Sequence, residues 1–325
     1  MDPGALTKAE RASAQCVPAV RAGQAVAKSA GAIYSDNMGQ QDFIAVDWGT
    51  TNRRAYRIRA GAVIGSVQDA LGVTAVPAGG FEQEVARLRE ALGDAPMLLA
   101  GMVGSNRGWV DAGYVPTPAT LEQLSAAMVA PTGGVRIIPG VRHVAEGRGD
   151  VMRGEEVQLL GAISAGLAPP DALLCQPGTH CKWAWMRDGA IARFVTAMTG
   201  EMFALLRNHA LIGQEMTGEI SAGDAFADGV RDGARGDLLA SLFGVRPASL
   251  LGLRARADAA AYVSGLLIGA DCAAYATGQR VHLLADAALG ALYASAIVQL
   301  GGQAVRIDSQ AAFIAGATRL WENLT

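Results

Sequence analysis

Two apolar segments far apart in the chain each run directly into a short polar turn. Residues 43–46 (FIAV) lead into the turn 47–52 (DWGTTN), and residues 172–176 (ALLCQ) lead into the turn 177–180 (PGTH). Strand-like segments resume after both turns, at 55–58 and 182–186. Although no sequence repeat is visible, this recurring order of strand, polar turn and strand predicts a duplicated α/β fold.

The composition is that of a globular chain with room for two domains. Of its 325 residues, 51% are hydrophobic and 18% are charged, a balance that permits sizeable cores and argues against a disordered chain. The formal net charge is −3, and no run of Lys or Arg provides the basic surface that nucleic acids require. The most apolar long segment, 262–275, contains Asp271 and is shorter than the roughly 20 residues of a membrane span. We therefore expect a buried helix there, and neither nucleic acid nor membrane as a partner.

The cysteines indicate a reducing compartment. The four are scattered and form no CxxC pair. Cys175 and Cys181 flank the second turn beside His180, but without a second group of ligands, packed thiols are favoured over a metal site. The expected location is the cytoplasm.

Differences in composition divide the chain into three parts. Residues 1–41 are rich in Ala, Gly and Gln without a hydrophobic period, so we expect a disordered extension. A first domain is predicted over 42–145 and a second over 146–325, because the stretch 140–150 is polar and glycine-rich. Within them we expect an amphipathic helix at 81–92, a helix at about 152–167 and a strand–helix–strand–helix ending.

The first turn has the chemistry of a metal and phosphate site. Gly49, Thr50 and Thr51 offer backbone N–H and hydroxyl donors to phosphate oxygens. Asp47, at the end of a buried strand, is a hard oxygen ligand suited to Mg²⁺. The alternative is an ordinary hairpin turn that is capped by an Asp.

The second turn offers matching groups. Gly178 and Thr179 can meet phosphate oxygens, and Lys182 can meet phosphate charge. Two such loops facing each other would neutralise the phosphates of a nucleotide from both sides. A tight structural turn is the alternative, with His180 as a structural histidine; no metal is assigned to it.

Two further stretches carry candidate groups. The loop 102–109 combines hydroxyl, amide, guanidinium and indole groups, a mixture that suits a polyhydroxylated acid, although an irregular surface loop would look the same. These groups belong to Ser105, Asn106, Arg107 and Trp109. At 151–156 (VMRGEE) a carboxylate could accept the proton of a substrate hydroxyl. Acidic residues are, however, also favoured in first helical turns by the helix dipole.

Taken together, these stretches resemble the 2-dehydro-3-deoxygalactonokinase family of the sugar kinase, heat-shock-protein-70 and actin superfamily. The matching segments are IAVDWGTTNRRAY, AGMVGSNRGW, VMRGEEVQLLGA, PGTHCKW, MTGE and SGLLIGA, in family order from residue 44 to 270. AGMVGSNRGW, VMRGEE and PGTHCKW are specific to this group, whereas DWGTTN is shared across the superfamily. The resemblance implies an α/β fold of two RNase-H-like domains, of the actin and hexokinase type, around a central cleft. It also implies phosphorylation of 2-dehydro-3-deoxy-D-galactonate to its 6-phosphate with ATP and Mg²⁺, in galactonate breakdown.

The same resemblance gives the candidate residues their roles. The first phosphate loop comprises Asp47, which is also the metal ligand, Gly49, Thr50, Thr51 and Asn52. The second comprises Gly178, Thr179, His180 and Lys182. Candidate bases are Glu155, then Glu156, then Asp150, because the helix that VMRGEE begins holds the catalytic carboxylate in hexokinase-like enzymes. Arg153 joins the loop residues as a substrate contact, and Gly265 and Gly269 are placed beside the nucleotide, although close helix packing explains their spacing fully.

Several alternatives stay open. The related acid 2-dehydro-3-deoxygluconate differs from the expected substrate in one hydroxyl configuration. A non-catalytic sugar-acid sensor is disfavoured because residues 1–41 show no DNA-binding helix pair, and an actin-like filament protein is disfavoured by SNRGW and RGEE. Asp286 departs from the small residues expected beside the adenine, so we expect altered adenine contacts. The expected partners are a small sugar acid and, as an alternative to a monomer, a second copy of the chain.

Overall fold

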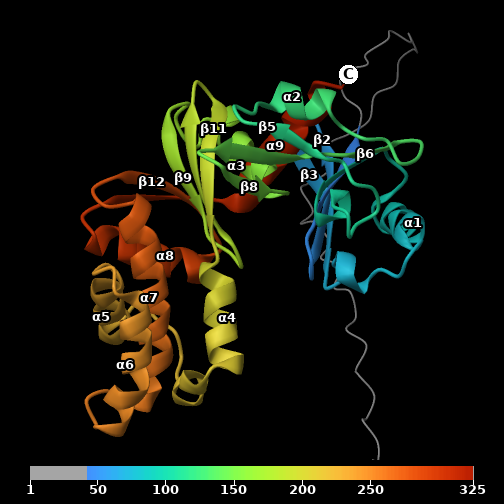
Figure 1. Ribbon diagram of the computed structural model, residues 1–325. Coiled ribbons are helices and arrows are strands. Elements are labelled where there is room, and N and C mark those ends of the chain that lie inside the picture. The colour runs from blue at the N-terminus through green and yellow to red at the C-terminus, as the bar shows by residue number, and fades with distance from the viewer. Residues whose placement is uncertain (1–41, 325) are drawn as a thin grey trace, which may run out of the picture.

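The predicted strand at 43–46 is the centre of a five-stranded sheet (Figure 1). The computed structural model describes residues 42–324, so the predicted extension 1–41 lies outside the described residues. The strand order is β3-β2-β1-β4-β6, with β1, β4 and β6 parallel and β2 antiparallel to both of its neighbours. The strands are β1 (Phe43–Trp48), β2 (Arg53–Arg59), β3 (Ala62–Asp69), β4 (Met97–Gly101) and β6 (Val135–Ile137).

A second five-stranded sheet repeats this arrangement. Its order is β11-β10-β9-β12-β13, again with three antiparallel strands followed by two parallel ones. The strands are β9 (Ala172–Gln176), β10 (Cys181–Arg187), β11 (Ala190–Ala197), β12 (Arg280–Leu284) and β13 (Gln303–Ile307). The matching strand orders confirm the predicted fold class, two RNase-H-like units, although their sequences show no repeat.

Two helices lie between the sheets and join them into one core (Figure 1). These are α3 (Glu155–Ser164) and α9 (Ser309–Glu322). Their apolar residues share a buried cluster with Tyr56 of the first sheet and Phe194 of the second. The helices touch through backbone, because a Cβ on Gly161 would lie 2.0 Å from the Ala312 carbonyl oxygen and one on Gly316 would lie 2.1 Å from that of Val157.

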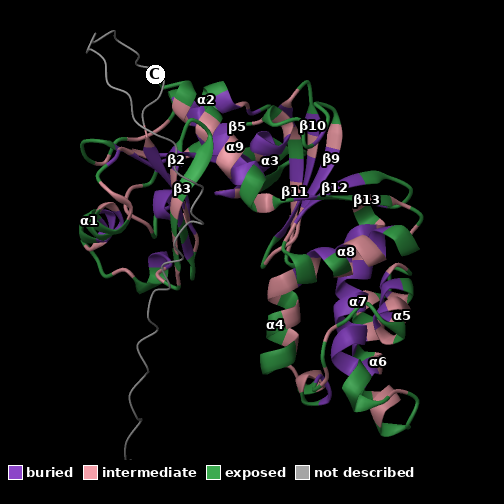
Figure 2. Cartoon of the chain, turned by 180° about the vertical axis from the view of Figure 1, so that it is seen from behind, coloured by how far each residue is buried: buried purple, intermediate pink, exposed green. Residues whose placement is uncertain are grey.

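The remaining helices surround these layers. On the first sheet, α1 (Phe81–Leu92), which is the predicted amphipathic helix, packs against the face away from α3 and α9, whereas α2 (Leu121–Ala126) packs against α9. On the side of the second sheet lie α4 (Thr199–His209), α5 (Asp224–Gly233), α6 (Leu238–Leu250), α7 (Arg256–Tyr275) and α8 (Ala287–Gln299). Of these, α5, α7 and α8 share a buried cluster with the sheet, and α6 packs against α7. The expected apolar helix is α7, which is buried along most of its length (Figure 2). Over residues 42–324, no helix is both long and apolar enough to span a membrane.

The glycine-rich stretch 140–150 forms a hairpin. It consists of β7 (Gly140–Ala145) and β8 (Arg148–Met152), which pair with β5 (Tyr114–Pro116) in a third, small sheet. The boundary that we place at 145/146 falls in the turn of this hairpin, and the domain limits stay a prediction. After β8, Gly154 adopts a φ of 106°, a conformation that favours glycine. The chain therefore enters α3 only at Glu155, later than the helix start predicted near 152.

The α3–α9 contact gives a matched test of stability. Alanine is favoured over glycine inside a helix by about 1 kcal/mol, so Gly244→Ala in α6, where an added Cβ meets nothing within 4 Å, should stabilise the protein. Gly161→Ala should instead lower the free energy of unfolding by about 1–3 kcal/mol through overpacking. Thermal unfolding of both variants checks this, and equal melting temperatures would contradict the close contact.

Candidate active site

The first turn, 47–52, is held from behind by the segment that follows β3. Within the turn the Gly49 N–H donates to the Asn52 carbonyl at 2.9 Å. From behind, Val73 N–H donates to the Gly49 carbonyl at 3.0 Å, and the Thr74 hydroxyl donates to the Thr50 carbonyl at 2.8 Å. A Cβ on Gly72 would lie 2.2 Å from that same Thr50 oxygen. The turn is therefore preformed, and Thr50, Thr51 and Asn52 stay exposed.

Asp47 lies at the inner end of this turn. Burial raises the pKa of Asp47 to about 6; Arg54 opposes the shift, and the charge of Glu155 adds to it. Among the described residues, no hydrogen bond or ion pair within 4 Å neutralises this carboxylate. A poorly solvated carboxylate without a cation is costly, so the Asp47 site is suited to receive a metal ion.

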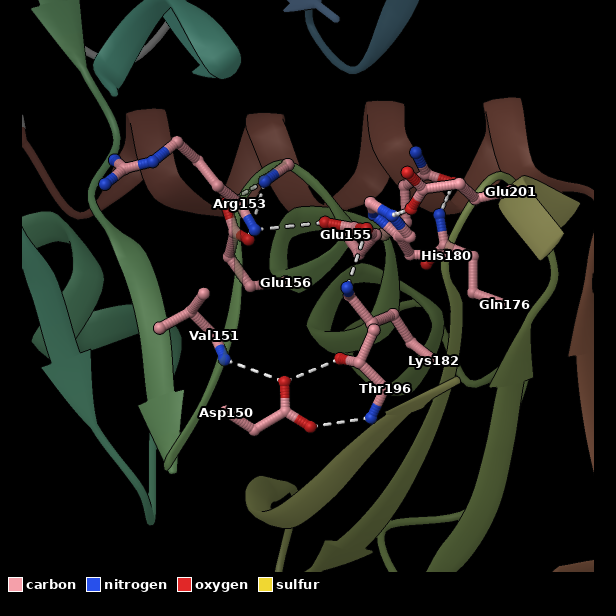
Figure 3. Close-up of polar contacts among 12 residues, drawn as sticks. Asp150, Val151, Arg153, Glu155, Glu156, Gln176, His180, Lys182, Thr196 and Glu201 are labelled. Carbon is pink, nitrogen blue, oxygen red and sulfur yellow. Dashed lines mark hydrogen bonds and ion pairs between the residues drawn. The ribbon is translucent and has the colours of Figure 1, made fainter. Parts of the chain in front are cut away.

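The second turn, 177–180, is held in the same way by the start of α4. The Glu201 N–H donates to the Thr179 carbonyl at 2.9 Å, and a Cβ on Gly200 would lie 2.4 Å from the Gly178 carbonyl oxygen. The His180 ring lies 2.6 Å from the Glu201 carboxylate (Figure 3). The residues of 42–324 contain no group of three or more His, Cys, Asp or Glu side chains placed to hold a metal.

The N-terminus of α3 brings Glu155 beside the second turn (Figure 3). One Glu155 carboxylate oxygen accepts the Arg153 N–H at 3.0 Å, and the other lies 3.6 Å from the ammonium group of Lys182. The Lys182 side chain is buried, whereas the Glu155 side chain is 25% exposed. Glu155 is therefore a carboxylate that is both oriented and open to a ligand.

The other two candidate bases are engaged elsewhere. Glu156 is fully buried and accepts the Gly154 N–H at 2.7 and 2.8 Å. Burial, and then the charge of Glu155, raise the pKa of Glu156 to about 8. The Asp150 carboxylate accepts the Thr196 N–H at 2.6 Å and the Thr196 hydroxyl at 2.7 Å, tying β8 to β11 (Figure 3). Of the three carboxylates, Glu155 has the best access to a substrate.

The loop after β4 lies against the same helix start. The Cα atom of Gly101 lies 3.1 Å from where a Cβ on Gly154 would be. In the loop, the buried Ser105 hydroxyl donates to the Met102 carbonyl at 2.7 Å, and Trp109 stacks on Phe81 with ring centroids 6.2 Å apart. Ser105 and Trp109 therefore serve the shape of the loop. Asn106 and Arg107 are exposed.

Arg153 is a buried cation with unpaired N–H groups. Its guanidinium lies over the Tyr114 ring at 4.3 Å, and its Nη2 donates to the Gly113 carbonyl at 3.1 Å. Asp111 contributes only a 3.6 Å contact. Arg153 Nε and Nη1 are buried without a hydrogen-bond partner, and Nη1 lies 3.2 Å from where a Cβ on Gly104 would be. Unsatisfied charged donors of this kind are costly unless a ligand pairs with them.

Two cavities flank the second turn. A cavity of about 810 Å³ lies between the parts of the chain built on the two five-stranded sheets. Arg54 and Tyr56 of the first sheet form one wall, and the other wall includes Gln176, Asp286 and Arg306 from the second sheet and its connections. A smaller, mostly apolar cavity of about 140 Å³ lies behind the turn, between Gly178, α4, α7 and α8. The Asp286 carboxylate accepts the Leu289 N–H at 2.9 Å and so caps α8, which gives a structural reason for an Asp at this position.

Gly265 and Gly269 line neither of these two cavities. A Cβ on Gly265 would lie 2.2 Å from the Phe226 carbonyl oxygen, and one on Gly269 would lie 2.5 Å from that of Val230. Both glycines therefore serve the close packing of α7 on α5. The residues that sequence reasoning missed are those that hold the turns, Gly72 and Gly200. Gly200 is the glycine of the motif MTGE, one of the segments that match the family. The motif could have drawn attention to this residue, but the sequence alone assigns it no role.

Comparisons with known proteins agree with the motifs. The family model described as 2-keto-3-deoxy-galactonokinase matches residues 47–320. A 2-dehydro-3-deoxygalactonokinase from Escherichia coli (strain K12) is 36% identical over 283 residues, which cover 84% of this chain and 95% of the relative. The crystal structure of a protein from Sinorhizobium meliloti, described as a putative 2-dehydro-3-deoxygalactonokinase, is similar to this one with a TM-score of 0.80 and 34% sequence identity. The match covers 86% of this chain and 97% of that chain. These matches extend over both sheets and both turns, and the chain therefore belongs to the 2-keto-3-deoxy-galactonokinase family of sugar-acid kinases.

Proposed function

We propose that this chain transfers the terminal phosphoryl group of ATP to the 6-hydroxyl of 2-dehydro-3-deoxy-D-galactonate, in galactonate breakdown. The observation that carries the proposal is the convergence of three segments on the start of α3, which carries Glu155. The first polar turn and the loop after β4 lie against Gly154, and the second turn reaches Glu155 through Lys182, just beyond it. Phosphoryl transfer depends mainly on such positioning and on charge stabilisation.

The residues present fit a nucleotide and its metal. Thr50, Thr51 and Asn52 would hold phosphate oxygens from one side, and Gly178 and Thr179 from the other. The unpaired Asp47 carboxylate would hold Mg²⁺, which when bound offsets the negative charge of the phosphates. The apolar cavity behind Gly178 has the lining that a nucleobase requires.

Two side chains would act on the acceptor. Glu155, oriented by the Arg153 N–H and facing Lys182, would accept the proton of the attacking hydroxyl. The unpaired guanidinium donors of Arg153 would hold the carboxylate of the sugar acid, because Arg pairs with carboxylates in a bidentate way. An acceptor held at its carboxylate would leave its far hydroxyl free to react.

A coupled assay of ADP release tests the proposal. Turnover is expected with 2-dehydro-3-deoxygalactonate and not with galactose, which lacks the carboxylate. The gluconate epimer forms the third arm, since it is the alternative substrate. Absence of turnover on any keto-deoxy acid would overturn the kinase assignment.

Replacing the candidate base should slow the chemical step. Glu155→Gln is expected to lower kcat by about 10²–10⁴ because it removes the proton acceptor. Asp150→Asn should instead weaken the link to Thr196 and act chiefly on stability. Steady-state kinetics with melting temperatures separate the two effects, and a loss below about tenfold for Glu155→Gln would move the role to another carboxylate.

Glu156 should make stability depend on pH. Its pKa is raised from 4.5 to about 8, so between these values the folded state keeps a proton that the unfolded chain releases. The free energy of unfolding should therefore fall as the pH rises through this window, at up to about 1.4 kcal/mol per pH unit. Glu156→Gln, which is neutral at every pH, should flatten the dependence in urea unfolding. An unchanged slope would show that Glu156 is not the group responsible.

Arg153 should govern affinity for the acid. Losing its charged hydrogen bonds should raise KM for the sugar acid by about 10–100-fold in Arg153→Met, from about 1.5–3 kcal/mol. KM for ATP should change little in Arg153→Met. Arg107→Met, which replaces an exposed arginine, is the matched control and should raise KM for the sugar acid less. Equal changes in both Michaelis constants of Arg153→Met would argue against a carboxylate contact.

A further inference from the structure

Asp271 is a buried carboxylate that binds three separate elements. It lies on α7 and is 7% exposed. It accepts the Trp183 indole N–H at 2.7 Å, the Thr199 hydroxyl at 2.8 Å and the Tyr293 hydroxyl at 2.9 Å. Burial raises the pKa of Asp271, and the three hydrogen bonds oppose that shift. Within residues 42–324 it forms no ion pair, so neutral donors alone offset the cost of burying it.

One partner leads to the second phosphate turn. Thr199 is the first residue of α4, and the next two residues hold the turn. Gly200 packs on the Gly178 carbonyl and Glu201 N–H donates to the Thr179 carbonyl. Through Thr199, Asp271 therefore fixes the helix start against which the turn rests.

The second partner forms a wall of the apolar cavity. Tyr293 lines the 140 Å³ cavity together with Thr199, Gly178 and the apolar side chains of α4, α7 and α8. Its hydroxyl and that of Thr199 bind the same Asp271 oxygen. The third partner, Trp183, lies on β10 directly after Lys182, so the strand that leaves the turn is held as well.

We infer that Asp271 is a positioning residue that holds the second phosphate turn and the apolar cavity as one unit for nucleotide binding. This inference rests on the proposed function, in which the turn holds phosphate and the cavity holds the base. Displacing a positioned group by a fraction of an ångström weakens binding strongly. The effect should therefore fall on ATP and spare the sugar acid, whose predicted contacts lie at Arg153 on the other side of Glu155.

Kinetics of three variants test the inference. Asp271→Asn keeps an acceptor for Trp183 but cannot accept from both hydroxyls. It is expected to raise KM for ATP by about tenfold or more, since a buried hydrogen bond to a charged group is lost, and to leave KM for the sugar acid within about twofold. Thr199→Val and Tyr293→Phe each remove one hydroxyl and should show the same selective change to a smaller degree. They keep the test available if Asp271→Asn fails to fold.

Tyr262→Phe is the matched control. The Tyr262 hydroxyl also donates to a carboxylate, that of Asp232, at 2.8 Å, but Tyr262 does not line the cavity. Its replacement should leave both Michaelis constants unchanged. Equal effects of Tyr293→Phe and Tyr262→Phe, or equal shifts of both constants in Asp271→Asn, would reduce Asp271 to a general structural role and overturn the inference.

Equilibrium binding separates this inference from the proposed function. Calorimetric titration with a non-hydrolysable ATP analogue should show the same loss of affinity in Asp271→Asn and no loss in Tyr262→Phe. If the wild-type protein binds the analogue but phosphorylates no keto-deoxy acid, the proposed function fails and the positioning role stands. If the wild type is active and Asp271→Asn binds the analogue normally, the positioning role fails alone.

Discussion

The backbone contact between α3 and α9 at Gly161 and Gly316 supports the rest of the structure. Because neither position carries a Cβ, the two helices approach closely enough for both sheets to share one buried core. That crossing fixes where α3 begins, and therefore where Glu155 lies relative to both polar turns. The site is thus made from the ends of elements whose positions are set by packing elsewhere: Gly161 lies six residues after Glu155, roughly 9 Å along α3 at about 1.5 Å of rise per residue.

The two halves solve the same problem in the same way. In each, a strand delivers the chain to a polar turn, and the segment after the third strand holds that turn through a glycine, Gly72 in one half and Gly200 in the other. Rigid turns lose little entropy on binding, which favours affinity for a charged ligand. The halves differ in what lies beside them. The loop after β4 adjoins the buried cation Arg153, whereas an apolar cavity adjoins the second turn, and this asymmetry matches an acid at one end and a nucleotide at the other.

Much of this could be predicted from the sequence because the signals are local. Strand periodicity and turn residues identified both turns, and the spacing of Phe81, Val85 and Leu88 identified α1. The rest depends on tertiary packing. Glu155 and Glu156 are neighbours of the same type, and only their helix's position decides that one is open and the other fully buried. Likewise, the sequence of Gly265 and Gly269 permits either a nucleotide contact or a helix contact, and α5 occupies that space.

The most direct test of the account is a crystal structure with a non-hydrolysable ATP analogue, Mg²⁺ and 2-dehydro-3-deoxygalactonate. The account predicts that the terminal phosphate lies between the turns 47–52 and 177–180. It also predicts the acceptor hydroxyl within hydrogen-bond distance of the Glu155 carboxylate and the acid group at the Arg153 guanidinium. Phosphates bound away from either turn, or an acceptor hydroxyl that faces a carboxylate other than Glu155, would contradict it.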